Sequence, residues 1–346
     1  MKTICIDARL LSGPGIGTYL RNLLQRMQDA PIRWFALVSD VERFPFKDRI
    51  EPIAVSSSIY SIQEQLELPL KIPTCDLFWS PHYNIPLLPI RAKKRLVTIH
   101  DVFHLSFAHE LKLHKRLYAK TVIEKAVKAS AAVITDSQFS KGEIQRYTRI
   151  AEEKIAVILL AADSDLFSPQ PVKKEKFILF VGSPKPHKNL KGLVAAFKML
   201  KTEVNLVIIG KKEGVKVLEN LDQLQGERIQ FLHDIPDHQL SHYYRTAELM
   251  VFPSFYEGFG LPPLEAMSCG CPVITSHAGA LPEVCGDAVM YVDPHSPMQI
   301  AGAIEELMGN EEKKRELSLK GLEQSKRFSW KQAADSHLKL IDRLIT

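Results

Sequence analysis

The sequence has few cysteines, and their spacing matches neither a disulfide framework nor a metal site. The five are Cys5, Cys75, Cys269, Cys271 and Cys285, an odd number without a C-x-x-C pair. A disulfide framework needs paired cysteines in an oxidising compartment, and a structural zinc site needs closely spaced ligand pairs. The cysteines are therefore expected to be reduced thiols.

Long hydrophobic runs are also missing. A membrane-spanning helix needs about 20 apolar residues, whereas the longest apolar runs here have the length of a strand and end in charge, proline or glycine. The first residues, MKTICIDARL, enter an expected strand at once and show no apolar run before a small-residue cleavage site. We therefore expect a cytoplasmic protein that does not span a membrane.

Charge of one sign is not in large excess. Lys and Arg number 45 against 40 Asp and Glu, which gives a net charge of +5. Such a mild excess suits phosphate-bearing ligands or an anionic membrane without indicating nucleic acid. The chain also lacks internal repeats and low-complexity tracts, and its 346 residues are enough for two ordinary domains.

Apolar runs of strand length alternate with amphipathic stretches along the chain. Strands are expected at 3–7, 32–38, 76–80, 95–100, 131–135 and 155–160, and then at 177–181, 205–210, 229–232, 249–252, 272–275 and 289–292. In the second half, helices are expected from Asn189, near Gly214, and over 237–245, 262–269 and 297–308. Strands that alternate with helices indicate parallel, doubly wound sheets. The sequence therefore predicts an α/β fold with two Rossmann-like domains.

The domain boundary is predicted from a break in this alternation. The segment SPQPVKKEK (168–176) contains two prolines and a run of charges, as linkers do. We predict an N-terminal domain over 1–167, a linker over 168–176 and a C-terminal domain over 177–328. The remaining residues, 329–346, form an amphipathic helix that is expected to pack back across the cleft.

A first candidate site follows the expected strand at 177–181. In open α/β sheets, ligands bind beyond the carboxyl ends of the strands, where backbone amides and helix N-termini are available. The loop GSPKPHKN leads into a helix with Asn189 as its expected N-cap, which places Lys188 beside unpaired N–H groups. The pattern is typical of a phosphate cradle, although a polar turn with solvated lysines has the same composition.

The segment 252–273 carries more information. Glu257 and Glu265 have seven residues between them. The glycines in this interval let the backbone approach a ligand closely, and Pro262 suits the first turn of a helix. One carboxylate therefore lies on a loop and the other in a helix whose N-terminus favours an anion. Such a pair can accept hydrogen bonds from sugar and ribose hydroxyls.

Several motifs together carry a family resemblance. The E-x7-E pair, the stretch VGSPKPHKNLKGLVAAF and the long segment PSFYEGFGLPPLEAMSCGCPVITSHAGALPEVCGDAVMYVDP lie between Val181 and Asp293. IDARLLSGPGIGTY, VTIHD, VITDSQFSK and the terminal FSW extend the match over essentially the whole chain. The sequence closely resembles the retaining family-four glycosyltransferases of the GT-B architecture. That resemblance implies two Rossmann-like, doubly wound domains facing each other across a cleft, with the acceptor held by the N-terminal domain.

The resemblance also implies a role for each matching residue. Glu265 would bind the ribose hydroxyls, Glu257 the donor sugar and Lys188 the diphosphate. His100, at the family's His-Asp position, would lie beside the reacting sugar, and His100, Glu257 and Lys188 would be the catalytic residues. The other implied donor-binding positions are Gly15, Gly17, Ser183, Leu240, Gly258, Phe259, Gly260 and Leu261.

Asp163-Ser164-Asp165 looks like the DxD motif that holds a divalent metal in the other large glycosyltransferase architecture. It lies just before the predicted linker, where relatives of the GT-B type carry a turn. The resemblance implies that a lysine and helix dipoles take the place of a metal. We therefore expect no metal and no cofactor.

The stretch 111–130 is rich in basic residues. They are Lys112, Lys115, Arg116, Lys120, Lys125 and Lys128. A basic amphipathic helix can contact an anionic membrane, and a solvated helix face has the same composition. The sequence leaves both interpretations open.

The function implied by the resemblance is retaining transfer of a hexose from a nucleotide diphosphate sugar to a saccharide or lipid-linked acceptor. The YEGFGLP wording resembles mannosyltransferases that use GDP-mannose in bacterial polysaccharide or glycolipid assembly. A UDP-sugar transferase, a sugar-nucleotide epimerase of the same architecture and a nucleotide-sugar sensor without turnover are alternatives. A glycoside hydrolase would need two carboxyl groups flanking the bond and no phosphate cradle.

Overall fold

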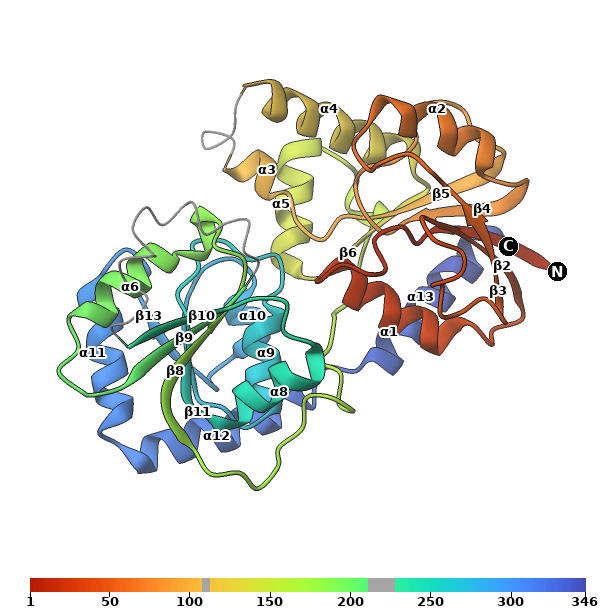
Figure 1. Cartoon of the computed structure of the whole chain (residues 1–346). Coiled ribbons are helices and arrows are strands. Elements are labelled where there is room, and N and C mark those ends of the chain that lie inside the picture. Colours follow the sequence, from red (N-terminus) through yellow and green to blue (C-terminus); the bar gives the residue numbers. More distant parts are fainter. Residues whose placement is uncertain (108–112, 211–227) are drawn as a thin grey trace. The chain divides into compact units, whose positions relative to one another are not determined.

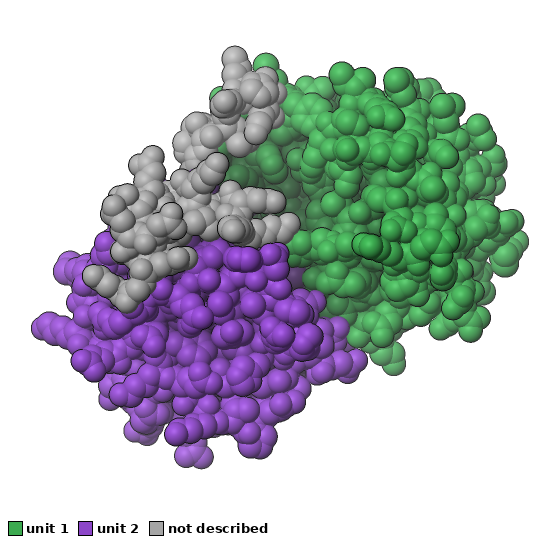
Figure 2. All heavy atoms as spheres, viewed as in Figure 1, with its two compact units in different colours: residues 1–160, 330–346 green, residues 161–329 purple. Residues whose placement is uncertain are grey.

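The computed structural model describes residues 1–107, 113–210 and 228–346. Its internal contacts divide the chain into two compact units (Figure 2). Unit 1 comprises residues 1–160 and 330–346, and unit 2 comprises residues 161–329. Each unit contains one parallel sheet with helices against it, which confirms the predicted α/β class (Figure 1).

The sheet of unit 1 has seven strands in the order β3-β2-β1-β4-β5-β6-β7, and all neighbours are parallel. Parallel sheets are covered on both faces, so their strands read as nearly continuous apolar runs. The strands are β1 (Lys2–Asp7), β2 (Ile32–Val38), β3 (Ile50–Ala54), β4 (Cys75–Ser80), β5 (Ala92–Thr98), β6 (Ala132–Thr135) and β7 (Ile155–Val157).

Helices cover both faces of this sheet. The helices of unit 1 are α1 (Ile16–Met27), α2 (Ile62–Lys71), α3 (Phe103–Ser106), α4 (Leu113–Ala129), α5 (Gln138–Thr148) and α13 (Trp330–Ile345), with a 3-10 turn, η2 (Glu152–Lys154). Helices α1 and α13 pack side by side (Figure 1). On the other face, Leu68 of α2 packs with Cys5 and Phe78, and Ile123 of α4 packs with Val97.

Unit 2 repeats this plan with six parallel strands in the order β10-β9-β8-β11-β12-β13. They are β8 (Glu175–Val181), β9 (Asn205–Ile209), β10 (Ile229–Leu232), β11 (Ala247–Phe252), β12 (Val273–Ser276) and β13 (Met290–Val292). The other elements are η3 (Pro186–Lys188), α6 (Leu190–Lys198), α8 (Asp237–Thr246), α9 (Leu261–Ser268), α10 (Leu281–Cys285), α11 (Pro297–Met308) and α12 (Glu311–Ser325).

Residues 161–176 lie within unit 2, which places the division between the units earlier than the segment 168–176. The Arg245 guanidinium donates hydrogen bonds to the carbonyls of Leu166 and Ser168, and Phe167 packs edge-on against Tyr244. These contacts attach this stretch to α8. At the other end, α13 returns to unit 1, where His337 bonds to Tyr19 of α1.

Several elements differ from the sequence prediction, β3 and β7 among them. Strand β3 was not predicted, because Pro52 and Glu51 interrupt its apolar pattern; proline is tolerated there because β3 is an edge strand. The predicted strand 155–160 is shorter, since β7 ends at Val157. The helix predicted near Gly214 lies outside the described residues. Among the helices that the structure describes, none combines the length and apolar content needed to cross a membrane.

Candidate functional site

The loop after β8 is fixed by the residue that caps the next helix. Asn189 has a left-handed backbone (φ 56°), and its side-chain oxygen accepts a hydrogen bond from the amide of Gly192, as predicted for the N-cap of α6. Its side-chain nitrogen donates to the carbonyls of Pro253 and Pro294. The loop that carries Lys188 is therefore tied to the loop that follows β11.

Lys188 and Glu257 form a buried ion pair, which we call the Lys188–Glu257 pair. The Lys188 Nζ lies 2.6 Å from the Glu257 Oε1, and the Ser254 hydroxyl donates to the same oxygen at 2.7 Å. The side chains are only 17% and 8% exposed. Charges this buried are rarely found unpaired. The pair thus places a lysine and a carboxylate together at the carboxyl edge of the unit 2 sheet.

The backbone of Glu257 is held by the loop after β12. The amide of Ala280 donates to the Glu257 carbonyl at 3.0 Å. Gly279 lies against the same residue, and a Cβ at this position would be 2.2 Å from the Glu257 carbonyl oxygen. Gly279 also has φ +62°, a conformation that side-chain-bearing residues rarely adopt. The position of Glu257 therefore depends on this glycine.

We expect Gly279→Ala to displace Glu257 and to lower the sugar transfer that the resemblance implies by at least about tenfold. The clash and the left-handed backbone together cost about 1–3 kcal/mol, so the melting temperature should also fall by several degrees. Turnover and thermal unfolding measure the two effects. Gly302→Ala is the matched control, because a Cβ at Gly302 meets nothing within 4 Å. A Gly279→Ala enzyme as active as the control would contradict this account.

Helix α9 begins directly after the Glu257 loop. Gly260 is its N-cap with φ 106°, and prolines stand at the first helical positions. A side chain on Gly260 would also meet Leu281, because an added Cβ would be 2.8 Å from its Cδ2. Phe259 is buried and packs edge-on against Phe328. The cap has no side-chain hydrogen bond. Pro262 and Pro263 carry no backbone N–H, so Leu261 supplies the amide of the first turn, and the helix dipole adds positive potential there.

Glu265 lies inside α9 and is buried. The hydroxyl of Tyr244, on α8, donates to its Oε2 at 2.9 Å. Burial raises the pKa of Glu265 to about 7; the Tyr244 hydrogen bond opposes this shift, and the negative charges of Asp237 and Asp163 add to it. Near neutral pH, the carboxyl can therefore lose its proton, and the carboxylate can then accept hydrogen bonds from a ligand's hydroxyl groups.

A second group of polar residues lies in unit 1, beyond the carboxyl ends of β5 and β6. The Nδ1 of His100 is 2.6 Å from the Oδ2 of Asp136, and its Nε2 is 3.2 Å from the carbonyl oxygen of Pro81. A carbonyl only accepts hydrogen bonds, so the Nε2 that faces Pro81 carries a proton. Burial lowers the pKa of His100, but the charges of Asp136 and Asp101 outweigh burial and raise it overall. Burial raises the pKa of Asp136, while the charge of His100 opposes that shift. The neighbouring carboxyl groups therefore favour the protonated form of His100.

Tyr19 and the terminal helix pack around this histidine. The ring of Tyr19 meets that of His100 edge-on, with 4.9 Å between centroids. The Tyr19 hydroxyl bonds to His337 at 2.7 Å and to Thr98 at 3.0 Å. Burial lowers the pKa of His337 to about 4, so this second histidine is neutral. Helix α13 thus supports the residue that positions His100.

Gly15 and Gly17 lie at the start of α1 in unit 1. Gly15 is the N-cap and has φ 66°. Gly17 faces the carbonyls of Leu10 and Leu11, and an added Cβ would be 2.8 and 2.6 Å from their oxygens. Both positions therefore require glycine for the backbone. The other predicted donor residues, Ser183, Leu240, Gly258 and Leu261, all belong to unit 2.

The DxD-like residues form a turn. The Asp163 side chain accepts a hydrogen bond from the Asp165 amide at 3.2 Å, and its carbonyl accepts from the amides of Leu166 and Phe167. Within residues 1–107, 113–210 and 228–346, no three His, Cys, Asp or Glu side chains are grouped so that they could hold a metal ion.

The sequence analysis did not identify four of the residues that form these sites. They are Tyr19, Asp136, Tyr244 and Ser254. Asp136 directly follows the strand predicted at 131–135, so its position at a strand end was a usable signal. Tyr244 lies 21 residues before Glu265 in the sequence, and no local pattern connects them.

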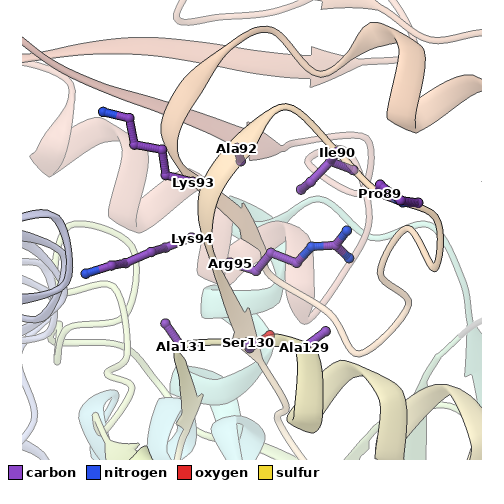
Figure 3. Close-up of a pocket in the computed structure, with 9 residues that line it drawn as sticks. All are labelled: Pro89, Ile90, Ala92, Lys93, Lys94, Arg95, Ala129, Ser130 and Ala131. Carbon is purple, nitrogen blue, oxygen red and sulfur yellow. The ribbon is translucent and has the colours of Figure 1, made fainter.

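A pocket of about 380 Å³ lies elsewhere in unit 1, at the amino ends of β5 and β6 (Figure 3). Its lining residues include Lys93, Lys94, Arg95 and Ser130. Arg95 donates hydrogen bonds to the carbonyls of Pro86 and Leu88. Ligands of open α/β sheets bind at the opposite edge, beyond the carboxyl ends of the strands. The pocket is therefore separate from the residues described above.

Comparison with known proteins places the chain in a family. Residues 162–324 match the family described as Glycosyl transferases group 1, a span that lies within unit 2. The chain is 32% identical to O-antigen chain mannosyltransferase B of Escherichia coli, over 70% of this chain and 68% of that protein. It is 29% identical to O-antigen chain mannosyltransferase RfbU of Salmonella typhimurium, over 72% and 69% respectively.

Solved structures share the fold. Sucrose-phosphate synthase from Thermosynechococcus elongatus aligns with a TM-score of 0.83 at 19% identity, over 99% of both chains. Anabaena HepE in complex with UDP and glucose aligns with a TM-score of 0.79 at 18% identity, over 99% of this chain and 100% of that one. Two parallel sheets, the family match and the mannosyltransferase relatives agree with the predicted family. The chain belongs to the group 1 glycosyltransferases and is a glycosyltransferase of the GT-B fold.

Proposed function

We propose that the protein transfers mannose from GDP-mannose, with retention of configuration, to a saccharide or lipid-linked acceptor in the assembly of a bacterial surface polysaccharide. The observation that carries the proposal is the buried Lys188–Glu257 pair beside the N-terminus of α9. It combines a cation, a helix N-terminus and a carboxylate, which suit a diphosphate joined to a hydroxylated ring. The names of the O-antigen mannosyltransferase relatives favour mannose and an O-antigen-type product.

In the proposed reaction, the bond between the anomeric carbon and the diphosphate oxygen breaks as charge accumulates on the diphosphate. Lys188, the amide of Leu261 and the positive N-terminal end of the α9 dipole stabilise that charge, which is where preorganised electrostatics contribute most to rate. The acceptor hydroxyl attacks the same face of the sugar, so its oxygen forms the new bond. Glu257 orients the sugar by accepting hydrogen bonds from its hydroxyls.

The acceptor's proton must go to a base, and the state of His100 helps to identify it. The Nδ1 of His100 faces the Asp136 carboxyl and its Nε2 faces the Pro81 carbonyl, so both ring nitrogens are already engaged within the protein. The leaving diphosphate oxygen is the simplest remaining base, since it gains negative charge as the bond breaks. In this scheme, His100 contributes positive charge and hydrogen-bond donors, with Asp136 and Tyr19 keeping it in place.

The identity of the donor is the first test. We expect GDP-mannose to raise the melting temperature more than UDP-glucose, because a ligand that binds only the folded state stabilises it by mass action. UDP-glucose is the informative rival, since HepE has been solved with UDP-glucose. A larger shift with UDP-glucose would favour a glucose-type transferase. Turnover of the donor without any acceptor would favour an epimerase instead.

We also propose that transfer needs no metal. In that case, EDTA should leave both donor binding and turnover unchanged, because Lys188 and the positive N-terminal end of the α9 dipole offset the charge of the diphosphate. Turnover that is lost in EDTA and restored by magnesium or manganese would contradict this proposal. It would also reopen the question of a metal at Asp163 and Asp165.

A further inference from the structure

Three apolar residues of helix α2 point away from the sheet that the helix packs against. Ile62, Leu66 and Leu70, spaced four residues apart, are 84%, 59% and 71% exposed. The residues that face the sheet are Leu68 and Glu64, both fully buried. An amphipathic helix normally turns its apolar stripe toward the core. Here, an apolar stripe faces away from the protein.

Other exposed apolar side chains adjoin this stripe. Among the described residues, more than half of the exposed large apolar side chains fall within 60–70, 87–88 and 117–118. We call the surface formed by Ile62, Leu66, Leu70, Leu87, Leu88 and Leu117 the α2–α4 face. Large apolar patches on soluble domains usually mark an interaction site.

Hydrogen bonds connect the three segments of the α2–α4 face. Gln65 of α2 bonds to the carbonyl of Ile85 and the amide of Leu87. The hydroxyl of Tyr118, on α4, donates to the side chain of Asn84, which in turn donates to Glu64 of α2. Helices α2 and α4 therefore flank the segment 84–88, and Figure 1 shows both on the same side of unit 1.

The charges around this face are mostly positive. Lys71 at the end of α2 and Arg116, Lys120 and Lys128 on α4 are exposed. Lys120 lies 4.0 Å from Glu124, whereas the other three have no carboxylate partner within the described part of the chain. The partly exposed acid of α2, Glu67, accepts hydrogen bonds from Ser56 and Ser57. An apolar surface edged by lysine and arginine is complementary to anionic lipid headgroups above acyl chains.

We propose that the α2–α4 face docks on the surface of an anionic lipid bilayer. The apolar side chains enter the boundary between headgroups and acyl chains, while the basic side chains meet the lipid phosphates. The face adjoins the carboxyl edge of the unit 1 sheet, because the amide of Asn84 bonds to His82, whose carbonyl accepts from Ser80 of β4. Docking therefore brings that edge to the membrane. The proposal does not depend on which sugar is transferred.

The test is sedimentation of the full-length protein with vesicles of phosphatidylcholine, alone or mixed with phosphatidylglycerol. The wild type should bind the mixed vesicles more tightly, with an affinity that falls as salt is added. Ile62→Gln/Leu66→Gln/Leu70→Gln should weaken that binding at least about tenfold, because three apolar side chains no longer enter the lipid. The matched control is Met199→Gln/Met298→Gln/Leu319→Gln, which changes three exposed apolar residues of unit 2 and should bind as the wild type does.

A second variant tests the charges separately. Arg116→Gln/Lys128→Gln should weaken binding to the mixed vesicles by about tenfold and reduce its salt dependence, while leaving the weak binding to phosphatidylcholine unchanged. Equal binding by the wild type and the Ile62/Leu66/Leu70 variant would overturn the proposal. A second outcome would also overturn it: the wild type is a dimer without vesicles, the Ile62/Leu66/Leu70 variant is a monomer, and both bind vesicles equally. The face would then bind a second copy of the chain. Transfer to a water-soluble acceptor should stay at the wild-type rate in both variants.

Discussion

Replacing Lys188 by methionine is expected to lower the rate of sugar transfer by about a hundred- to a thousandfold. Methionine keeps the length of the side chain but removes the charge that, in the proposed reaction, neutralises the leaving diphosphate. Loss of one preorganised donor to developing negative charge costs about 3–4 kcal/mol of transition-state stabilisation. Steady-state turnover with saturating donor would measure the loss, because the defect should appear mainly in kcat.

This variant needs two controls. Lys185→Met removes an exposed lysine from the same loop and should change turnover by no more than a few fold. Lys188→Met also leaves Glu257 buried without its cationic partner, which can destabilise the fold. Lys188→Met/Glu257→Gln removes both charges and should recover the melting temperature but not the activity. Equal losses from Lys185→Met and Lys188→Met would mean that the loop supplies only diffuse positive charge.

Binding of the donor is expected to weaken about tenfold when the pH is lowered from 8 to 6, because the carboxylate of Glu265 becomes protonated. Burial raises the pKa of this carboxyl to about 7, and in its proposed role only the ionised form accepts hydrogen bonds from both ribose hydroxyls. Each pH unit below the pKa therefore lowers the affinity by about a factor of ten. Calorimetry with whichever nucleotide sugar binds would measure it, because the diphosphate diester has no proton to gain in this range.

Glu265→Gln should make donor affinity independent of pH across this range. At pH 8 it should also lower the affinity about ten- to a hundredfold, since charge-assisted hydrogen bonds are worth roughly 1.5–3 kcal/mol. Glu257→Gln is the matched comparison. It should leave the affinity for the free nucleoside diphosphate almost unchanged while lowering transfer, because Glu257 is assigned to the sugar. Equal losses of nucleoside diphosphate affinity in the two variants would contradict this division.

The same carboxyl affects folding stability in a defined direction. It holds its proton up to a pH of about 7 in the folded protein, compared with 4.5 ordinarily. Between these values, the folded state binds more protons than the unfolded state, so its contribution to stability is present below pH 4.5 and is lost as the pH rises toward 7. Glu265→Gln should remove this contribution to the pH dependence of the melting temperature, and a dependence that persists unchanged would show that other groups cause it.

The local features of unit 2 could be predicted because they depend on residues close together in the sequence. A left-handed asparagine before an apolar run caps a helix, and a glycine followed by two prolines begins one. For this reason, Asn189 at the start of α6 and Glu257 on the loop before α9 lie in the kind of element that the sequence predicted. The alternation of strands and helices likewise predicted two parallel sheets.

The pairings between distant residues were decided by the tertiary structure. Lys188 follows β8 and Glu257 follows β11, and they meet because these two strands are neighbours in the sheet. His100 and Asp136 meet for the same reason, since β5 lies beside β6.

Strand order depends on how whole elements pack, so the sequence spacing of these residues does not reveal it. The sequence by itself predicted the fold class and the family, and it singled out Glu257 and Glu265 as candidate ligand-binding residues. Only the packing of the elements decided which charges are paired, which carboxyl is buried deeply enough to hold a proton near pH 7, and which apolar residues remain exposed on α2. These properties depend on distance and solvent access in three dimensions.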